Sequence, residues 1–171
     1  GGLLRVRLMT QDDAHIYCRP DQIGREIQKL LALTKEVYDA FGFPLTFNLA
    51  TRPEKAMGEI KLWRKAEAAL EGALKDAKAT YAVKQKDGAF YGPKIDVNMH
   101  DVLGREWTVA TIQLDFQMPE RFNLAYIDEQ GKKQRPVMIH RAILGSFDRF
   151  IGILLEHTAG DLPVWLYPTH V

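Results

Sequence analysis

The chain has 171 residues, 46% of them hydrophobic and 26% charged, which is enough to bury a substantial core in one globular domain. Its formal net charge of +1 gives no overall electrostatic case for nucleic-acid binding, so any RNA contact must come from local patches. No apolar run approaches the roughly 20 residues that span a bilayer, there is no signal-peptide pattern, and one cysteine excludes an internal disulfide, so we expect a cytoplasmic protein without a membrane partner.

The first predicted element is an extended strand over residues 4–8 that leads into residues 10–15. Alternation with period two separates an apolar face from a polar one. The polar face carries Arg5, Arg7, Met9, Gln11, Asp13 and His15. Such a row fits either the solvated face of an antiparallel sheet or a binding site, and the alternation alone favours neither.

Next, Pro20 opens a helix whose apolar stripe ends at Gly42 and Pro44. The alternating residues 44–51 predict a strand. A second amphipathic helix follows, with an apolar side made of Trp63, Ala66, Leu70, Leu74 and Ala77. Residues 81–85 predict a short strand, and Lys86-Asp87-Gly88 a hairpin turn after it.

Two longer strands are predicted over residues 95–99 and 105–116, with a turn at 101–104 between them. Residues 129–133 predict an exposed hairpin tip, and residues 137–140 an extended segment. Ser146 caps a last helix, which ends near Gly160. Consecutive strands flanked by helices indicate an α+β fold with a mainly antiparallel sheet.

Five blocks identify a family resemblance: Gln-Asp-Asp-Ala-His at 11–15, Thr-Arg-Pro-Glu-Lys at 51–55, Gly-Ala-Phe-Tyr-Gly-Pro-Lys-Ile-Asp at 88–96, Thr-Ile-Gln-Leu-Asp-Phe at 111–116 and Arg-Pro-Val-Met-Ile-His-Arg-Ala-Ile-Leu-Gly-Ser at 135–146. With these blocks in this order the chain resembles the threonyl-tRNA synthetases. The resemblance implies part of the class II aminoacyl-tRNA synthetase catalytic fold. It also implies ATP-dependent activation of L-threonine and transfer to tRNA(Thr) by a homodimer.

The resemblance implies the following site residues. Arg5, Lys94 and Arg149 act in catalysis, Arg5 on the ATP phosphates, Lys94 at the adenylate phosphate and Arg149 on the adenine face. The amino acid is contacted by Gln11, Asp13, Tyr91 and Gln113. ATP, which carries Mg²⁺, is bound by Arg5, Met9, Thr108, Gln113 and Arg149.

A zinc ion is implied as well, held by His15, His140 and a cysteine upstream of this segment. In the family it binds the amino and hydroxyl groups of threonine, and Asp13 accepts the hydroxyl proton. Such a site can reject valine, because valine would leave the metal and the carboxylate unsatisfied. Cys18 does not match the ligand position and is interpreted as a small buried apolar residue.

Several residues depart from the family pattern. Met9 replaces the usual phenylalanine under adenine, Thr108 replaces a glutamine that contacts ATP, and Asp148 replaces a glutamate. The alternative to a ligase is therefore a synthetase-like paralogue with impaired catalysis that acts in binding or regulation.

The resemblance also implies the domain boundaries. Residues 1–167 would form the C-terminal part of the catalytic domain, and residues 168–171 the start of a linker to an anticodon-binding domain. We expect the 171-residue chain alone to be inactive, because the family places the dimer interface and the cysteine ligand upstream. The block at 51–55 has no physical role that the sequence reveals.

Overall fold

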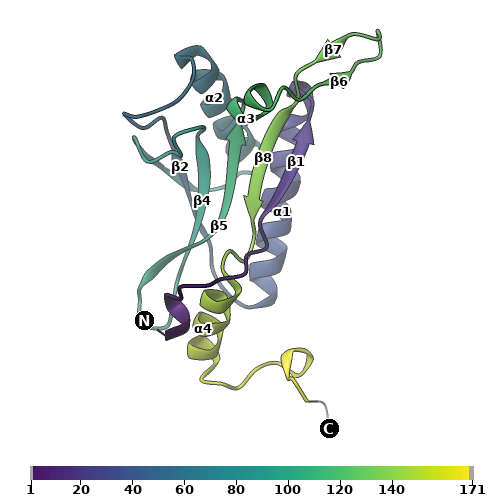
Figure 1. Cartoon of the computed structure of the whole chain (residues 1–171). Helices are drawn as coiled ribbons and strands as arrows, with labels where there is room; N and C mark the ends of the chain where they lie inside the picture. The colour runs from purple at the N-terminus through teal and green to yellow at the C-terminus, as the bar shows by residue number, and fades with distance from the viewer. Residues whose placement is uncertain (1, 170–171) are drawn as a thin grey trace.

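The computed structural model describes residues 2–169. Its helices are α1 (Ile23–Ala40), α2 (Ile60–Asp76), α3 (Gln117–Arg121) and α4 (Phe147–Thr158), with the 3₁₀ turns η1 (Gly2–Leu4), η2 (Pro20–Gln22) and η3 (Val164–Leu166) (Figure 1). Its strands are β1 (Ala14–Cys18), β2 (Thr46–Ala50), β3 (Tyr81–Lys84), β4 (Lys94–His100), β5 (Glu106–Asp115), β6 (Tyr126–Ile127), β7 (Lys133–Gln134) and β8 (Val137–Ala142).

Six of these strands form one sheet in the order β1-β8-β5-β4-β2-β3, and β6 and β7 form a separate hairpin. Every neighbouring pair in the large sheet is antiparallel except β2 and β3. The predicted α+β class with a mainly antiparallel sheet is therefore confirmed. Within residues 2–169, no helix is both long enough and apolar enough to cross a membrane.

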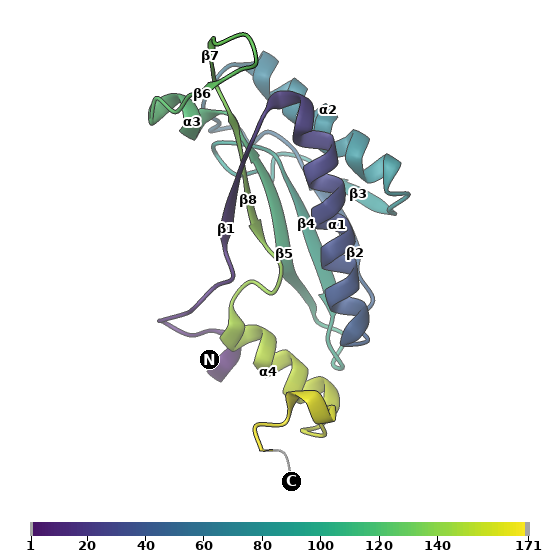
Figure 2. The ribbon, with the colours of Figure 1, turned by 90° about the vertical axis from the view of Figure 1, so that its right-hand side faces the viewer.

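The two faces of the sheet differ in what covers them. α1 and α2 lie side by side on one face, whereas α4 lies beyond one end of the sheet and α3 near the other (Figure 2). Alternate residues of β4 and β5, among them Ile95, Val97 and Ile112, are fully buried in the core with the apolar stripe of α1. The residues between them therefore face the opposite, polar side, which no long helix covers.

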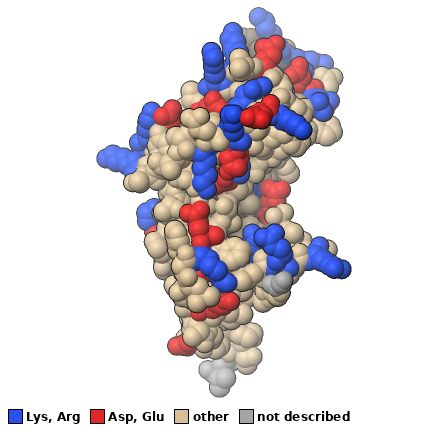
Figure 3. Space-filling model, turned by 90° about the vertical axis from the view of Figure 1, so that its left-hand side faces the viewer, with Lys and Arg blue, Asp and Glu red and all other residues tan. Residues whose placement is uncertain are grey.

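Seen from another side, lysine and arginine side chains are mixed with aspartate and glutamate over the visible surface (Figure 3). The outline is hollowed between the upper part of the molecule and its lower part. This mixture agrees with the near-zero net charge of the sequence, which gave no case for broad electrostatic binding of nucleic acid.

The predicted strand over residues 4–8 is wrong. Residues 2–4 form η1, and the chain then runs irregularly to β1 at Ala14. A strand needs a hydrogen-bonded neighbour, and no described strand pairs with residues 5–9. Leu3 and Leu4 instead pack on Gly152 of α4, where the missing Cβ leaves room for them.

The predicted hairpin at residues 86–88 is also wrong, although the chain does turn there, with Lys86 at a φ of 62°. β3 and β4 are not neighbours, because β2 lies between them. α2 connects β2 to β3 as a parallel crossover, which places β3 at the sheet edge. The short helix α3 was not predicted, whereas the hairpin tip at 129–133 and the cap of Ser146 on α4 are confirmed.

Candidate functional site

Four predicted site residues lie in one row across four adjacent strands. Lys94 of β4 pairs with Gln113 of β5, Gln113 pairs with His140 of β8, and His140 pairs with His15 of β1. Directly opposed residues of antiparallel strands project from the same face of the sheet. The register therefore brings a cation, an amide and two imidazoles together on the polar face.

The two histidines of the row are in contact. Their ring centroids are 4.7 Å apart and the ring planes make an angle of 76°. His15 is exposed and His140 is half-buried. Asp13 lies two residues before His15, and in extended backbone this spacing returns a side chain to the same face. Two imidazoles with an open side between them suit a metal that also binds a substrate.

Asp115 holds the ring of His140. The Nε2 atom of His140 lies 2.9 Å from Oδ2 of Asp115, and since a carboxylate only accepts, the imidazole donates and keeps Nδ1 free. The other carboxylate oxygen accepts from the backbone N–H groups of Gln117 and Met118. The Asp115 side chain is fully buried, and a carboxylate behind a histidine is the usual outer support of a zinc ligand.

These residues fit part of a zinc site. His15 and His140 would supply two nitrogen ligands to such an ion, and Asp115 would support His140 through their hydrogen bond. Among residues 2–169 no group of three or more histidine, cysteine, aspartate or glutamate side chains comes together as a metal site. Asp115 was missed from the sequence. Its position two residues after Gln113, on the same strand face, was the available signal.

Tyr91 covers the row. Its ring centroid lies 5.1 Å from that of His140, and its hydroxyl donates to Oε1 of Gln113. Burial raises the pKa of Tyr91, and the nearby carboxylates of Asp115 and Asp13 raise it further. The phenol therefore stays protonated and can keep donating at neutral pH.

Lys94 is tied to the sheet by an ion pair. Its Nζ atom lies 2.7 Å from Oδ2 of Asp96, the next residue on the same face. Burial raises the pKa of Asp96, while the hydrogen bond from Lys94 lowers it. Oδ1 of Asp96 is buried without a partner among the described residues. The lysine ammonium is thus held at one end of the row, next to Gln113.

The other predicted site residues are not members of the row. Arg149 of α4 donates from Nε to the carbonyl of Leu4 at 3.1 Å, and its guanidinium lies 5.3 Å from the ring centroid of Trp107. Thr108 donates to Oδ1 of Asn98 at 2.7 Å. Arg5, Met9 and Gln11 are exposed in the segment before β1. Arg149 and Thr108 therefore lie near the start of β5, outside the row.

Trp107, which the sequence did not single out, is half-buried and belongs to a polar cluster around the buried Asp101. Its indole Nε1 donates to Oδ2 of Asp101 at 2.7 Å, and Nε of Arg105 donates to the same oxygen at 2.5 Å. Burial alone would raise the pKa of Asp101, but hydrogen bonds from Trp107, from Arg105 and from the backbone of Leu103 lower it to about 2. The cluster thus holds the ring that Arg149 contacts.

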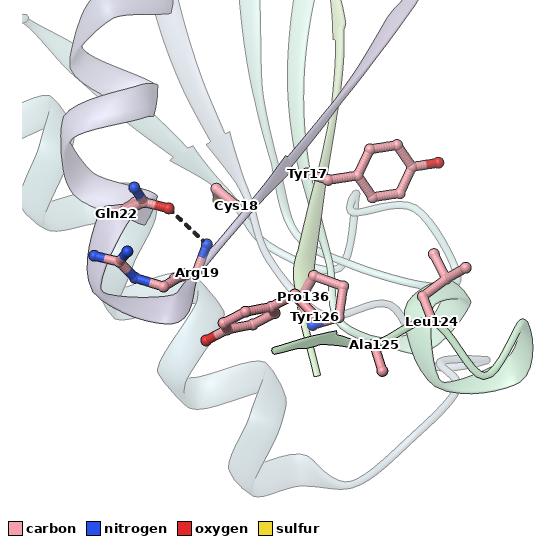
Figure 4. Close-up of a pocket in the computed structure, with 8 residues that line it drawn as sticks. All are labelled: Tyr17, Cys18, Arg19, Gln22, Leu124, Ala125, Tyr126 and Pro136. Carbon is pink, nitrogen blue, oxygen red and sulfur yellow. Dashed lines mark hydrogen bonds between the residues drawn. The ribbon is translucent and has the colours of Figure 1, made fainter. Parts of the chain in front are cut away.

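Cys18 lies away from the row, in a pocket at the far end of β1. The pocket is lined by Tyr17, Cys18, Arg19, Gln22, Leu124, Ala125, Tyr126 and Pro136 (Figure 4). Cys18 is buried, as the sequence predicted, and burial raises the pKa of its thiol above the ordinary value, with Glu26 and Asp21 adding to the rise. None of the predicted site residues lines this pocket.

The geometry agrees with comparisons to known proteins. The family described as the tRNA synthetase class II core domain (G, H, P, S and T) matches residues 1–158. The chain is 54% identical over 167 residues to a threonine–tRNA ligase of Geobacter sp. (strain M21), covering 98% of this chain and 26% of that protein. It therefore spans about a quarter of the length of the curated relatives that it matches.

Solved structures show the same similarity. A structure titled as the RNA binding domain of threonyl-tRNA synthetase from Cryptosporidium parvum Iowa II has a TM-score of 0.94 and 48% identity, covering 98% of this chain and 42% of that one. A putative threonyl-tRNA synthetase of Aeropyrum pernix has a TM-score of 0.81 and 33% identity, covering 96% of this chain and 39% of that one. The chain belongs to the class II tRNA synthetase core-domain family.

Proposed function

We propose that the chain is part of a threonine–tRNA ligase, which activates L-threonine with ATP and transfers it to tRNA(Thr). The observation that carries the proposal is the row of Lys94, Gln113, His140 and His15 in cross-strand register. In this row two histidines that could bind a metal and a glutamine that could hydrogen-bond an amino acid lie next to Lys94, whose charge could bind a phosphate. Similarity to threonine–tRNA ligases over nearly the whole chain supports the same activity.

The threonine end of the row comprises His15, His140 and Asp13, with Gln11, Gln113 and Tyr91 around it. A zinc ion bound by the two histidines and a further cysteine would act as a Lewis acid that holds the amino and hydroxyl groups of threonine. Asp115 orients His140 toward that ion through the hydrogen bond to Nε2. Asp13 accepts the threonine hydroxyl proton, which valine lacks.

The ATP end needs positioning and charge neutralisation rather than a protein nucleophile, because the threonine carboxylate itself attacks the α-phosphate. Lys94 and Arg5 neutralise phosphate charge together with Mg²⁺. Arg149 lies against adenine, and its contact with Trp107 supports it from the protein side. The remaining nucleotide contacts are those of Met9, Thr108 and Gln113.

The whole protein works as a homodimer in this proposal, in the cytoplasm. Residues 1–167 are the C-terminal part of its catalytic domain, and residues 168–171 begin a linker to an anticodon-binding domain. Of that linker, residues 170 and 171 lie outside the described residues. The size of the curated relatives, of which this chain spans about a quarter, supports further domains.

Threonine-dependent exchange between ATP and pyrophosphate, measured with the whole protein, tests the proposal. We expect exchange with threonine, one zinc per subunit, and a joint loss of zinc and exchange in His15→Ala. Absence of exchange in a folded, zinc-loaded protein would overturn the ligase and favour the catalytically impaired paralogue. An unchanged zinc content in His15→Ala would remove His15 from the metal site.

A further inference from the structure

The block Thr51–Lys55 is part of a segment that joins three regions of the fold. It begins where β2 ends, at Thr51, whose backbone N–H donates to the carbonyl of Lys84 at 3.0 Å. The carbonyl of Thr51 accepts from the N–H of Gly88 at 2.8 Å, and its hydroxyl accepts from the N–H of Lys86 at 3.2 Å. Thr51 thus makes one hydrogen bond to the last residue of β3 and two to the loop that follows it.

The same segment is anchored to α2. The N–H of Arg52 donates to the carboxylate of Glu67 at 2.8 Å. The indole of Trp63, which is 2% exposed, donates to the carbonyl of Met57 at 2.6 Å. The N–H of Met57 in turn donates to the carbonyl of Phe90 at 2.7 Å. Both ends of residues 51–57 therefore connect the helix to the loop that carries Phe90 and Tyr91.

Two glycines allow this loop to approach the backbone on either side of Tyr91. A Cβ on Gly88 would lie 2.7 Å from the carbonyl oxygen of Thr51, and a Cβ on Gly92 would lie 1.9 Å from the carbonyl oxygen of Leu114. Both obstructing atoms belong to backbone, which cannot swing aside as a side chain can. A side chain at either position would displace the loop, and Tyr91 with it.

We propose that residues 51–57 position Tyr91 by holding the loop that carries it. Thr51 in that segment and Gly88 in the loop are the positioning residues. Held in this way, the Tyr91 ring stays on His140 and its hydroxyl stays on Gln113, so the segment sets the shape of the threonine pocket without touching threonine. This inference rests on the proposed function, in which Tyr91 contacts the amino acid. It gives the Thr51–Lys55 block the physical role that the sequence alone did not reveal.

The test is Gly88→Ala in the whole protein, with Gly72→Ala as the matched control. Gly72 lies in α2, and an added Cβ there meets nothing within 4 Å. A misplacement of about 1 Å in a binding site can cost about 100-fold. We therefore expect Gly88→Ala to raise the KM for threonine by about ten- to a hundredfold and to raise the KM for ATP by a much smaller factor, through Gln113 alone. Gly72→Ala should change neither constant.

A double-mutant cycle with Tyr91→Ala separates positioning from general damage. If Gly88 acts through Tyr91, the threonine KM of the double variant should be less than about twice that of Tyr91→Ala alone. General destabilisation would lower kcat through the active fraction and leave both KM values unchanged. If Gly88→Ala does not fold, Thr51→Val replaces it in the test, because that change removes the hydroxyl that accepts from Lys86. Thr51→Val should raise the threonine KM a few-fold, and this rise should be absent in the Tyr91→Ala background.

Three results would overturn the inference: an unchanged threonine KM in a folded Gly88→Ala protein, an equal rise in both KM values, or a Gly88→Ala effect that persists in the Tyr91→Ala background. A threonine KM that does not respond to Tyr91→Ala would instead contradict the threonine contact in the proposed function. The two failures are thus distinguishable.

Discussion

The carboxylate of Asp12 accepts a hydrogen bond from the backbone N–H of Gly145 at 2.9 Å, across 133 positions of the chain. The same carboxylate accepts from the N–H groups of Ile143 and Leu144, and Arg141 donates to it from Nη1 at 3.2 Å. Asp12 lies directly before Asp13, whereas Gly145 directly precedes the N-cap of α4. One side chain therefore joins the threonine side of the candidate site to the helix that carries Arg149.

We predict that Asp12→Ala destabilises the whole protein far more than the matched surface variant Asp21→Ala. The Asp12 side chain is 17% exposed and its loss leaves several backbone N–H groups unsatisfied, whereas Asp21 is 66% exposed in a surface pair with Arg19. Hydrogen bonds to a charged group contribute about 1.5–3 kcal/mol, whereas an exposed surface pair contributes little. Urea unfolding followed by circular dichroism measures both, and equal midpoints would contradict the role of Asp12.

The sequence predicted the strand of His140 and the polar face of His15, but not that the two residues are opposed. Alternation assigns a side chain to a face of a sheet, yet the neighbours of a strand depend on the whole topology. The hairpin predicted after residues 81–85 shows the same limit, because local turn chemistry cannot reveal that β2 lies between β3 and β4.

The hydrogen-bonding roles of two carboxylates, the half-buried Asp12 and the buried Asp115, were also not predicted from the sequence. Asp12 accepts from backbone N–H groups such as that of Ile143, which lies 131 positions further along the chain. Asp115 accepts from His140, which lies 25 positions further along the chain. Such contacts cannot be predicted from the type of a residue and its spacing along the chain. The helices were easier to predict from the sequence, because the apolar stripe of α1 is a local pattern of period 3.6. Ile27 and Tyr38 are fully buried, as that pattern requires.

Asp115→Asn should weaken zinc binding without unfolding the protein. The asparagine oxygen can still accept from the N–H of Gln117, so the start of α3 is retained, but the charged acceptor of His140 is lost. Removing the outer partner of a metal-binding histidine typically costs about 10- to 100-fold in metal affinity. Competition with a chromophoric chelator measures the zinc affinity. An affinity equal to that of the unmodified protein, in a folded variant, would mean that Asp115 supports only α3.

Asp101 should make the fold sensitive to acid. Its pKa is lowered to about 2 in the folded protein, below the ordinary value of 3.8, because of the hydrogen bonds from Trp107 and Arg105. A group whose pKa is lower in the folded state stabilises the fold above its unfolded pKa, and that contribution disappears as the pH falls through the folded pKa. The stabilisation is therefore complete above about pH 5 and is lost between about pH 4 and pH 2.

Asp101→Asn is the matching variant. It should be less stable than the unmodified protein at pH 7, and the difference between them should shrink as the pH is lowered through this window. Thermal unfolding of both proteins from pH 7 to pH 2.5 measures the difference. A constant difference over that range would show that the charge of Asp101 does not contribute.

Asp13→Ala should narrow the preference for threonine over valine. The Asp13 carboxylate is exposed, and it lies close enough to Tyr91 for its charge to help raise the pKa of that phenol. If it accepts the threonine hydroxyl proton, its removal takes away an interaction that valine never makes. A hydrogen bond to a charged group is worth about 1.5–3 kcal/mol, so the ratio of kcat/KM values should fall about ten- to a hundredfold. Zinc would still bind the hydroxyl, and for that reason the preference should shrink rather than vanish.

The alternative for Asp13 is that it only holds the chain before β1. In that case activation of threonine and of valine would fall by the same factor, through loss of metal or of fold. Steady-state exchange assays with both amino acids, with the zinc content of each preparation measured, separate these outcomes. A selectivity ratio that stays at its original value in a zinc-loaded Asp13→Ala protein would show that Asp13 does not select threonine and that another group does.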